Sequence, residues 1–211
     1  MRFLITGFPP FPGRPLNPSQ RLVDAVAAGG LETEDFVATA LLPVEYQRVE
    51  SEILSQIEEV RPDVVLSFGV GRQAASWRLE QRARNWDEAT IPDNAGELRS
   101  GVAIDEHGPV DLWNPIDLHP LARELRSSDL DVEVGHNAGS YICNHLLYWA
   151  FTAGRIDSPG SFPKFVFVHL SPDCSEPARK NDLFGLQLMI NWFHNQPGRS
   201  RSTVSTIRNI I

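Results

Sequence analysis

Cys143 is the first residue in this sequence whose type and position could support catalysis. It follows the small residues 138–140 and lies about one turn inside a predicted helix that begins near Gly139. The exposed N–H groups and partial positive charge of a helix N-terminus favour a thiolate over a thiol. Cys143 is therefore a candidate nucleophile. The alternative is a buried cysteine that packs as a small hydrophobic residue.

His169 is the second candidate, because it ends the apolar run 165–168 at the edge of a predicted buried strand. Ligands of open α/β sheets bind at the carboxyl ends of the strands, and a histidine there can act as the base for a thiol. A core histidine bonded to backbone groups is an equal alternative. His145 stands only two residues after Cys143, so on a helix it points about 160–200° away and cannot easily serve the same thiol.

Glu80 is the third candidate. Residues 77–86 alternate as in a strand, and Glu80 is the only acid on a face shared with Arg78, Arg82 and Arg84. A carboxylate in this place could orient an imidazole, or it could belong to a solvated ladder of ion pairs.

The elements that must position these residues alternate between strand and helix. Strands are predicted at 2–7, 36–42, 64–68, 77–86, 132–134 and 165–170. Helices are predicted from Asn17-Pro18 to Gly29-Gly30 and at 44–60, 138–151 and 181–193, with a turn at 91–96 and an irregular segment at 101–121. Alternation of this kind is typical of an α/β fold with a parallel sheet.

The length of 211 residues predicts a single α/β domain at 1–195, followed by a polar tail at 196–211. The 19 basic and 27 acidic side chains give a net charge of −8, which argues against nucleic acid or an anionic membrane as partner. The apolar start is too short for a signal-peptide core, and two cysteines make no disulfide framework, so we expect a cytoplasmic protein. The six histidines are dispersed without zinc-site spacing, so no metal is predicted.

Five short motifs resemble, in order, those of the pyroglutamyl peptidase I family, also called pyrrolidone-carboxylate peptidases. They are Thr6-Gly7-Phe8 with Pro10-Phe11 and Asn17-Pro18; Leu79-Glu80; Ile91-Pro92-Asp93-Asn94 with Gly96; Ala138-Gly139 with Cys143-Asn144-His145 and Tyr148; and Phe167-Val168-His169. Each motif alone is weak, but five in register over roughly residues 1–195 are specific.

The resemblance implies a three-layer α/β/α sandwich around a mostly parallel, mixed and twisted central sheet. It implies a cysteine exopeptidase that removes an N-terminal pyroglutamyl residue from peptides through a thioester intermediate. In this sequence Cys143 would be the nucleophile, His169 the general base and acid, and Glu80 the group that orients the imidazole. The chemistry implied needs no cofactor, and the resemblance also suggests a homo-oligomer.

A pocket for the small, neutral pyrrolidone ring needs aromatic walls and a few hydrogen-bonding partners. By resemblance, we expect it to be lined by Phe8, Phe11, Val44, Val70, Ile91 and Ile142. Phe8 and Phe11 match two aromatic residues of the family's opening loop, although core packing would also account for them.

The sequence departs from the family pattern near this pocket. Val70-Gly71-Arg72-Gln73 replaces the usual Gln-Ala-Gly-Gly, Val44 stands where threonine is frequent, and Thr90 stands where arginine is common. Each change removes or moves a polar group. Two alternatives to the peptidase therefore stay open: a cysteine hydrolase of the same mechanism acting on another N-acyl or lactam substrate, and a non-catalytic binding homologue with an idle triad.

Overall fold

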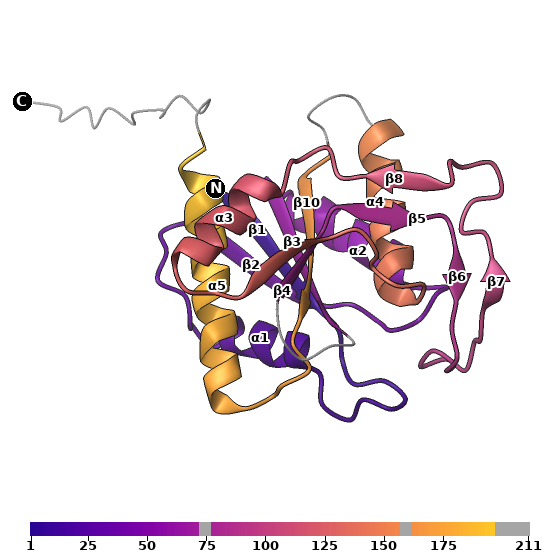
Figure 1. The fold of residues 1–211 in the computed structure, drawn as a ribbon, viewed down its shortest axis with the longest axis horizontal. Helices are drawn as coiled ribbons and strands as arrows, with labels where there is room; N and C mark the ends of the chain where they lie inside the picture. The colour runs from indigo at the N-terminus through magenta and orange to yellow at the C-terminus, as the bar shows by residue number, and fades with distance from the viewer. Residues whose placement is uncertain (72–76, 157–161, 197–211) are drawn as a thin grey trace, which may run out of the picture.

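A computed structural model describes residues 1–71, 77–156 and 162–196, so the predicted tail lies outside the description from residue 197 onward (Figure 1). In the described part, six strands form the central sheet in the order β2-β1-β3-β10-β4-β9. These strands are β1 (Arg2–Gly7), β2 (Phe36–Leu41), β3 (Val64–Val70), β4 (Trp77–Glu80), β9 (Val132–Gly135) and β10 (Lys164–Leu170). Neighbouring strands are parallel except β10 and β4. The predicted mixed, mostly parallel sheet is confirmed.

Helices cover both faces of this sheet, which gives the predicted three layers (Figure 1). One face packs against α1 (Pro18–Ala27), α3 (His119–Ser127) and α5 (Glu176–His194). The other packs against α2 (Val49–Val60) and α4 (Ile142–Ile156). Successive strand residues supply the two cores in turn, as Val65 and Leu66 do, because side chains alternate across a strand. A strand buried on both faces reads as a continuous apolar run, which explains why the central strands were predictable.

Local signals fix the start of two helices. The Asn17 side chain accepts a hydrogen bond from the Ser19 N–H, and Pro18 occupies the first turn of α1, as predicted. Ser175 caps α5 in the same way through the Ala178 N–H. The last helix therefore starts at Glu176, five residues before the predicted start at 181.

The segment 77–86 is two strands, not the single strand predicted. The chain leaves the central sheet after Glu80 and continues as β5 (Arg82–Arg84), which pairs with β8 (Asp111–Trp113) in a separate small sheet. Gln81 marks the break, because its side chain bonds to the backbone at Asn114, Ile116 and Leu118. A second pair, β6 (Asp87–Glu88) with β7 (Ser100–Val102), extends from this region.

Three further predictions were wrong in extent. Helix α2 starts at Val49 rather than 44, because the residues before it are bonded to the turn at 93–94. The Val44 carbonyl accepts from the Asn94 N–H, and the Tyr46 N–H donates to the Asp93 carboxylate. The segment 101–121 is not wholly irregular, since it contains β8 and the start of α3. Helix α4 starts at Ile142 rather than near Gly139, which has a φ of +85° and lies in the preceding loop. Among the described residues, no helix is long and apolar enough to cross a membrane.

Candidate active site

His169 and Glu80 meet on adjacent strands of the central sheet. His169 is the last residue but one of β10, and Glu80 ends β4. The His169 Nδ1 lies 2.7 Å from Glu80 Oε1, and both side chains are buried. Gly135 lies opposite Glu80 on β9, where an added Cβ would come within 2.5 Å of Glu80 Oε2. A glycine is therefore required beside this carboxylate.

Cys143 of α4 is the third member of this group. It is the second residue of α4, its side chain is half-buried, and it is hydrogen-bonded to His169. Because Glu80 occupies Nδ1, Nε2 is the ring nitrogen left for the sulfur. The three residues that the sequence singled out thus form one continuous chain of hydrogen bonds.

The His169 imidazole has a perturbed pKa. Burial alone would lower it, but the hydrogen bonds to Cys143 and Glu80 outweigh burial and raise the pKa of His169 to about 9. The ring is thereby suited to carry a proton at neutral pH while it stays within reach of the sulfur. It also packs edge-on against Phe167, with ring centroids 5.1 Å apart.

The residue after the cysteine anchors the start of α4. Asn144 is fully buried, and its amide accepts from the Arg84 N–H and donates to the carbonyl oxygens of Arg84 and Trp86. Sequence reasoning gave Asn144 no role. Asparagine next to a cysteine carries no signal until the fold brings the segment after β4 alongside the helix.

His145 takes part in a second buried ion-pair cluster. Its Nδ1 lies 2.7 Å from Asp87 Oδ2 and its Nε2 lies 3.0 Å from Glu50 Oε1, and Arg99 also contacts Asp87. Burial lowers the pKa of His145, but these two hydrogen bonds raise it to about 9. Its partners differ from those of Cys143, as its position on the helix predicts. The cluster ties α4 to α2 and β6, and no sequence pattern pointed to it.

Four of the six predicted pocket residues belong to the same apolar cluster as Cys143. Phe8, Val44 and Ile142 are buried in the same apolar cluster as the half-buried Phe11 and Cys143. Phe8 contacts Phe167, with ring centroids 6.4 Å apart, so an aromatic wall leads to His169.

Tyr141 is a further aromatic residue at this wall that sequence reasoning did not assign. Its ring lies 5.9 Å from that of Phe11, and its hydroxyl donates to the Pro92 carbonyl. Ile91 precedes Pro92 and is half-buried, so the predicted turn at 91–96 is joined to these aromatic residues through Tyr141. Buried Asp93 holds this turn together by accepting from the backbone N–H groups of Ala95 and Glu97.

Val70 is the predicted pocket residue that the strand pattern places elsewhere. A Cβ on Gly69 would face Cys143 and Phe167, so the next side chain on β3 points to the opposite face. Arg72 and Gln73, which follow it, lie outside the described residues. The side chain of Val70 therefore points away from the face of the sheet that carries Cys143.

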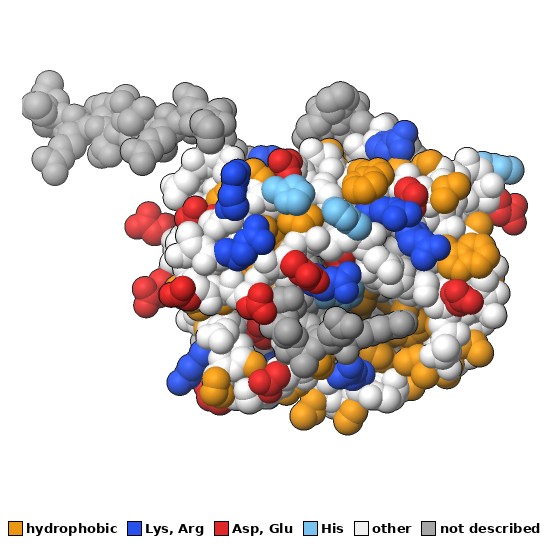
Figure 2. Space-filling view, in the orientation of Figure 1, with side chains coloured by type: hydrophobic (Ala, Val, Ile, Leu, Met, Phe, Trp, Pro, Cys, Tyr) orange, Lys and Arg blue, Asp and Glu red, His pale blue; other side chains and the backbone are white. Residues whose placement is uncertain are grey.

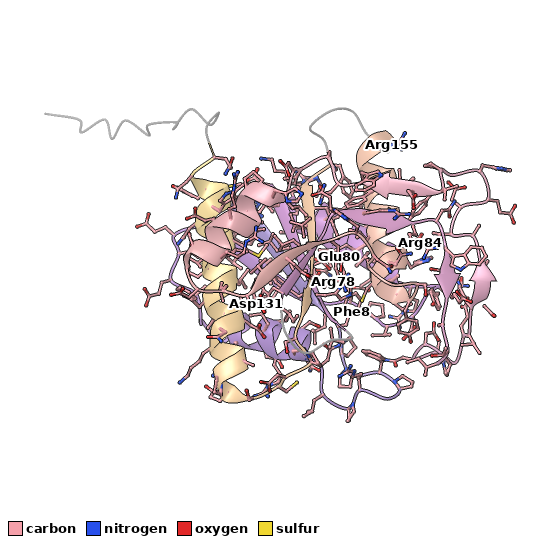
Figure 3. All side chains as sticks on the ribbon, viewed as in Figure 1. Phe8, Arg78, Glu80, Arg84, Asp131 and Arg155 are labelled. Carbon is pink, nitrogen blue, oxygen red and sulfur yellow. The ribbon has the colours of Figure 1, made fainter. Side chains whose placement is uncertain are left out.

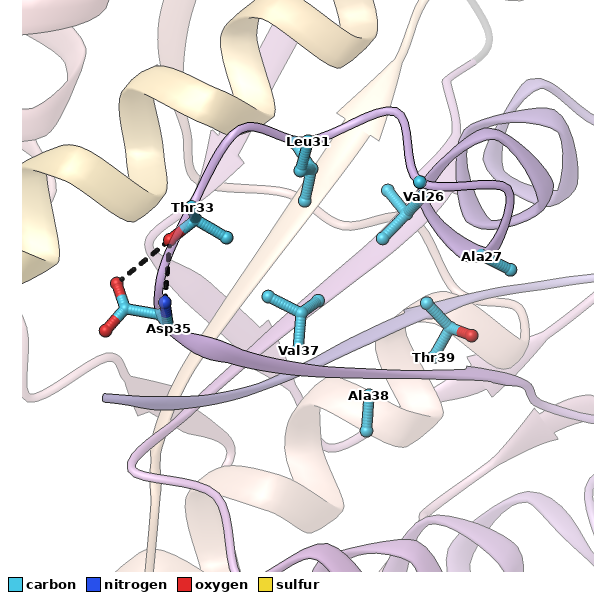
Figure 4. Close-up of a pocket in the computed structure, with 9 residues that line it drawn as sticks. Val26, Ala27, Leu31, Thr33, Asp35, Val37, Ala38 and Thr39 are labelled. Atoms are coloured by element: carbon cyan, nitrogen blue, oxygen red, sulfur yellow. Dashed lines mark hydrogen bonds between the residues drawn. The ribbon is translucent and has the colours of Figure 1, made fainter.

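A shallow hollow elsewhere on the molecule is separate from these residues. It lies between the end of α1 and β2 and is lined by Val26, Leu31, Val37 and Thr39 (Figure 4). Thr33 and Asp35 hydrogen-bond to each other at its rim. The hollow contains none of the predicted site residues. Within the described ranges, no cluster of His, Cys, Asp and Glu is arranged to hold a metal ion.

Comparison with known proteins shows to which family the chain belongs. The family model described as pyroglutamyl peptidase matches residues 1–183. The chain belongs to the pyroglutamyl peptidase family. A pyrrolidone-carboxylate peptidase of Brevibacillus brevis is 32% identical over 146 residues, which are 69% of this chain and 67% of that protein. One of Ralstonia nicotianae is 33% identical over 169 residues, covering 79% of this chain and 76% of its own length.

Solved structures of the family share the fold. The pyrrolidone carboxyl peptidase of Fervidobacterium islandicum superimposes with a TM-score of 0.80 at 26% identity, covering 91% of this chain and 97% of its own. A mutant of the Pyrococcus furiosus enzyme gives 0.82 at 20% identity over 94% of this chain and all of that one. The three-layer α/β/α architecture is therefore the architecture of the pyroglutamyl peptidase family.

Proposed function

We propose that this protein is a cysteine exopeptidase that removes an N-terminal pyroglutamyl residue from peptides. Cys143 is the nucleophile, His169 the general base and acid, and Glu80 the group that orients the imidazole. The observation that carries the proposal is the continuous hydrogen-bonded chain from Cys143 through His169 to buried Glu80, beside an apolar cluster that contains Phe8 and Phe11. Membership of the family and the names of the relatives support the same activity.

In the first step, the Cys143 sulfur attacks the carbonyl carbon of the pyroglutamyl residue and forms a tetrahedral intermediate. The ring of His169 holds the proton that the thiol gives up, and its position between the sulfur and Glu80 suits that transfer. The backbone N–H groups of the first turn of α4 have no partners within the helix, so they can donate to the developing oxyanion.

In the second step, the intermediate collapses and the leaving amine takes the proton from His169. This leaves a thioester between the pyroglutamyl group and Cys143. Water then attacks the thioester with His169 as the base, which releases pyroglutamate and restores the thiol. Glu80 accepts the Nδ1–H bond throughout, which fixes the tautomer and the orientation of the ring.

The aromatic wall supports recognition of the ring. Phe11 and Tyr141 are half-buried aromatic residues of the apolar cluster that also contains Cys143 and buried Phe8, so a small lactam ring can stack on their exposed faces. Val44 makes this wall more apolar than a threonine would, so we expect the polar contacts to the lactam to come from backbone groups. Cleavage of pyroglutamyl amides should then be measurable.

The test is a fluorogenic pyroglutamyl amide assay, with the matching N-acetyl amide as control substrate. Cys143→Ser should lose at least about 10³-fold in kcat/KM, because a hydroxyl is a far weaker nucleophile at this pH. Cys174→Ser is the matched control. Cys174 follows β10 in a loop, where its sulfur contacts the Pro172 carbonyl, and activity should be kept.

Two results would contradict the proposal. Full activity of Cys143→Ser would remove the nucleophile assignment. A reactive Cys143 that cleaves the N-acetyl amide but no pyroglutamyl amide would instead support a hydrolase of the same mechanism acting on another N-acyl substrate.

A further inference from the structure

We propose that Arg78 is a positioning residue of this site. Its guanidinium joins the triad acid to the loop that precedes the Cys143 helix, and its charge weakens the hold of Glu80 on the imidazole proton. The inference rests on the proposed triad, but its test is chosen so that the two can fail separately.

Arg78 stands at the centre of a row of charged side chains that crosses three strands. Strand pairing places Arg78 of β4 opposite His169 of β10 on one side and opposite Glu133 of β9 on the other. Glu80 lies two residues further along β4, so its side chain points to the same face as Arg78. Figure 3 shows Arg78 and Glu80 together near Phe8.

The contacts of Glu80 fall on one oxygen. Glu80 Oε1 lies 2.7 Å from His169 Nδ1 and 3.0 Å from Arg78 Nη2. Glu80 Oε2 is buried, and among the described residues it has no hydrogen-bonding partner. The hydrogen bond of the imidazole and the ion pair of the guanidinium therefore meet at a single oxygen, so a change at Arg78 should alter the bond that orients His169.

The same guanidinium reaches the loop before α4. Arg78 Nη2 donates to the Asn137 carbonyl at 2.7 Å, and Asn137 Oδ1 accepts from the Gly139 N–H at 3.2 Å. Gly139 has a φ of +85°, a conformation that glycine adopts without strain. Since Cys143 follows four residues later, Arg78 holds the triad acid and the approach to the nucleophile together.

The charges around His169 determine the direction of the electrostatic effect. Glu80 favours the protonated ring, whereas Arg78, its direct neighbour across the strands, disfavours it. Cys143 of α4 bonds to the ring, and Glu133 of β9 contacts Arg78 Nε at 3.3 Å but is 58% exposed. Without the Arg78 charge, the charged partner of Glu80 Oε1 is His169 alone. The imidazole should therefore stay protonated up to a higher pH.

The position of Arg78 at the surface makes this effect accessible to experiment. Its side chain is 30% exposed, while that of Glu80 is fully buried. Figure 2 shows positive and negative side chains side by side near the middle of the face over β4. An ordinary exposed ion pair contributes little. Arg78 differs because its partner is a buried carboxylate in the triad.

The experiment measures the rate of Cys143 alkylation by iodoacetate against pH in a Cys174→Ser background, together with the pH profile of kcat/KM on a pyroglutamyl amide. Iodoacetate is an anion, so its reaction with the thiolate slows at high pH when the neighbouring imidazolium loses its proton. Arg78→Gln should move the high-pH limb of both profiles upward by about 0.5 pH unit and lower kcat/KM about tenfold. Arg78→Lys should restore the limb but only part of the rate, because an ammonium cannot match the guanidinium fork. Arg84→Gln, which removes an exposed arginine at the end of β5, three residues past Gln81, is the matched control and should shift neither profile.

The possible outcomes distinguish the role of Arg78 from the proposed function. An unchanged limb in Arg78→Gln, with wild-type cleavage intact, overturns the role of Arg78 and leaves the triad standing. A shifted alkylation limb in a protein that does not cleave pyroglutamyl amides supports Arg78 and overturns the substrate. A wild-type alkylation profile equal to that of a free thiol overturns both.

Discussion

Gly69 lies directly against the candidate nucleophile, and replacing it by alanine tests the geometry of the site. A Cβ at Gly69 would stand 2.9 Å from Cys143 Sγ and 2.9 Å from Phe167 Cζ. Non-bonded heavy atoms prefer about 3.5–4.0 Å, so at least about 0.6 Å must be gained against each neighbour. Phe167 is fully buried and cannot move outward, so the displacement falls on the sulfur and on α4.

The expected cost follows from this displacement. A shift of nearly 1 Å at a reacting atom costs about 100-fold in rate, which is about 2.7 kcal/mol of transition-state stabilisation. Overpacking should also lower the free energy of unfolding by about 1–3 kcal/mol. The assays are kcat/KM on a pyroglutamyl amide and urea unfolding at pH 7.

Gly154→Ala is the matched control for Gly69→Ala. A Cβ at Gly154 in α4 would meet Phe162 at an ordinary 3.4 Å. Alanine in a helix is favoured over glycine by about 0.5–1 kcal/mol, so this variant should keep its activity and gain stability. Wild-type kcat/KM in Gly69→Ala would show that the reacting sulfur does not lie against β3, and the reasoning about the site would be refuted.

Three further outcomes are expected. Burial raises the pKa of Asp182 from 3.8 to about 6, so the penalty for ionising it in the folded protein builds up between about pH 4 and pH 6 and is complete above that range. Asp182→Asn, which still accepts the Trp77 Nε1–H bond, should therefore raise the free energy of unfolding by about 1–3 kcal/mol at pH 8 and much less at about pH 3.5 in urea titrations. The pKa of His145 is raised to about 9, so the stability that its ion pairs contribute is complete below about pH 6.5 and is lost as the pH rises through 9. His145→Gln should therefore lower the free energy of unfolding more at pH 6 than at pH 9.5. Equal effects at the two pH values would contradict the ion-pair cluster. Phe11→Leu, which removes the ring that faces Tyr141, should raise KM for a pyroglutamyl amide several-fold with little change in kcat, as steady-state kinetics would show.

The parts of the fold that could be predicted are those with strong local signals. Residues 2–7, 64–68 and 165–170 are continuous apolar runs because their strands are buried on both faces. Asn17 and Pro18 announce the start of α1 by chemistry that acts within three residues. By contrast, α3 buries only Leu121, Ala122 and Leu125, and the residues between them in the sequence are mostly charged. Its apolar stripe was therefore too short to predict a helix.

The sequence singled out the residues of the candidate site but not the contacts that join them. Alternation along 77–80 correctly placed Arg78 and Glu80 on one face, but it left open whether that face is solvated or carries an orienting carboxylate. Glu80 is buried because β9 and Gly135 cover it, and this depends on strand order, which no local pattern encodes. The break at Gln81 has the same origin, since β5 takes β8 as its partner only once residues 30 positions later are in place.

The order of strands in the sheet also determines how much of the chain is needed for a complete sheet. Strand β10 is the last strand of the described residues, yet it lies between β3 and β4, pairing with seven residues of the first and two of the second. It also carries His169. A chain that ends before residue 164 holds the proposed nucleophile and its carboxylate but lacks both the proposed base and the strand that joins the two halves of the sheet. Any such chain is therefore expected to be inactive, and activity should appear only after β10 has been inserted between β3 and β4.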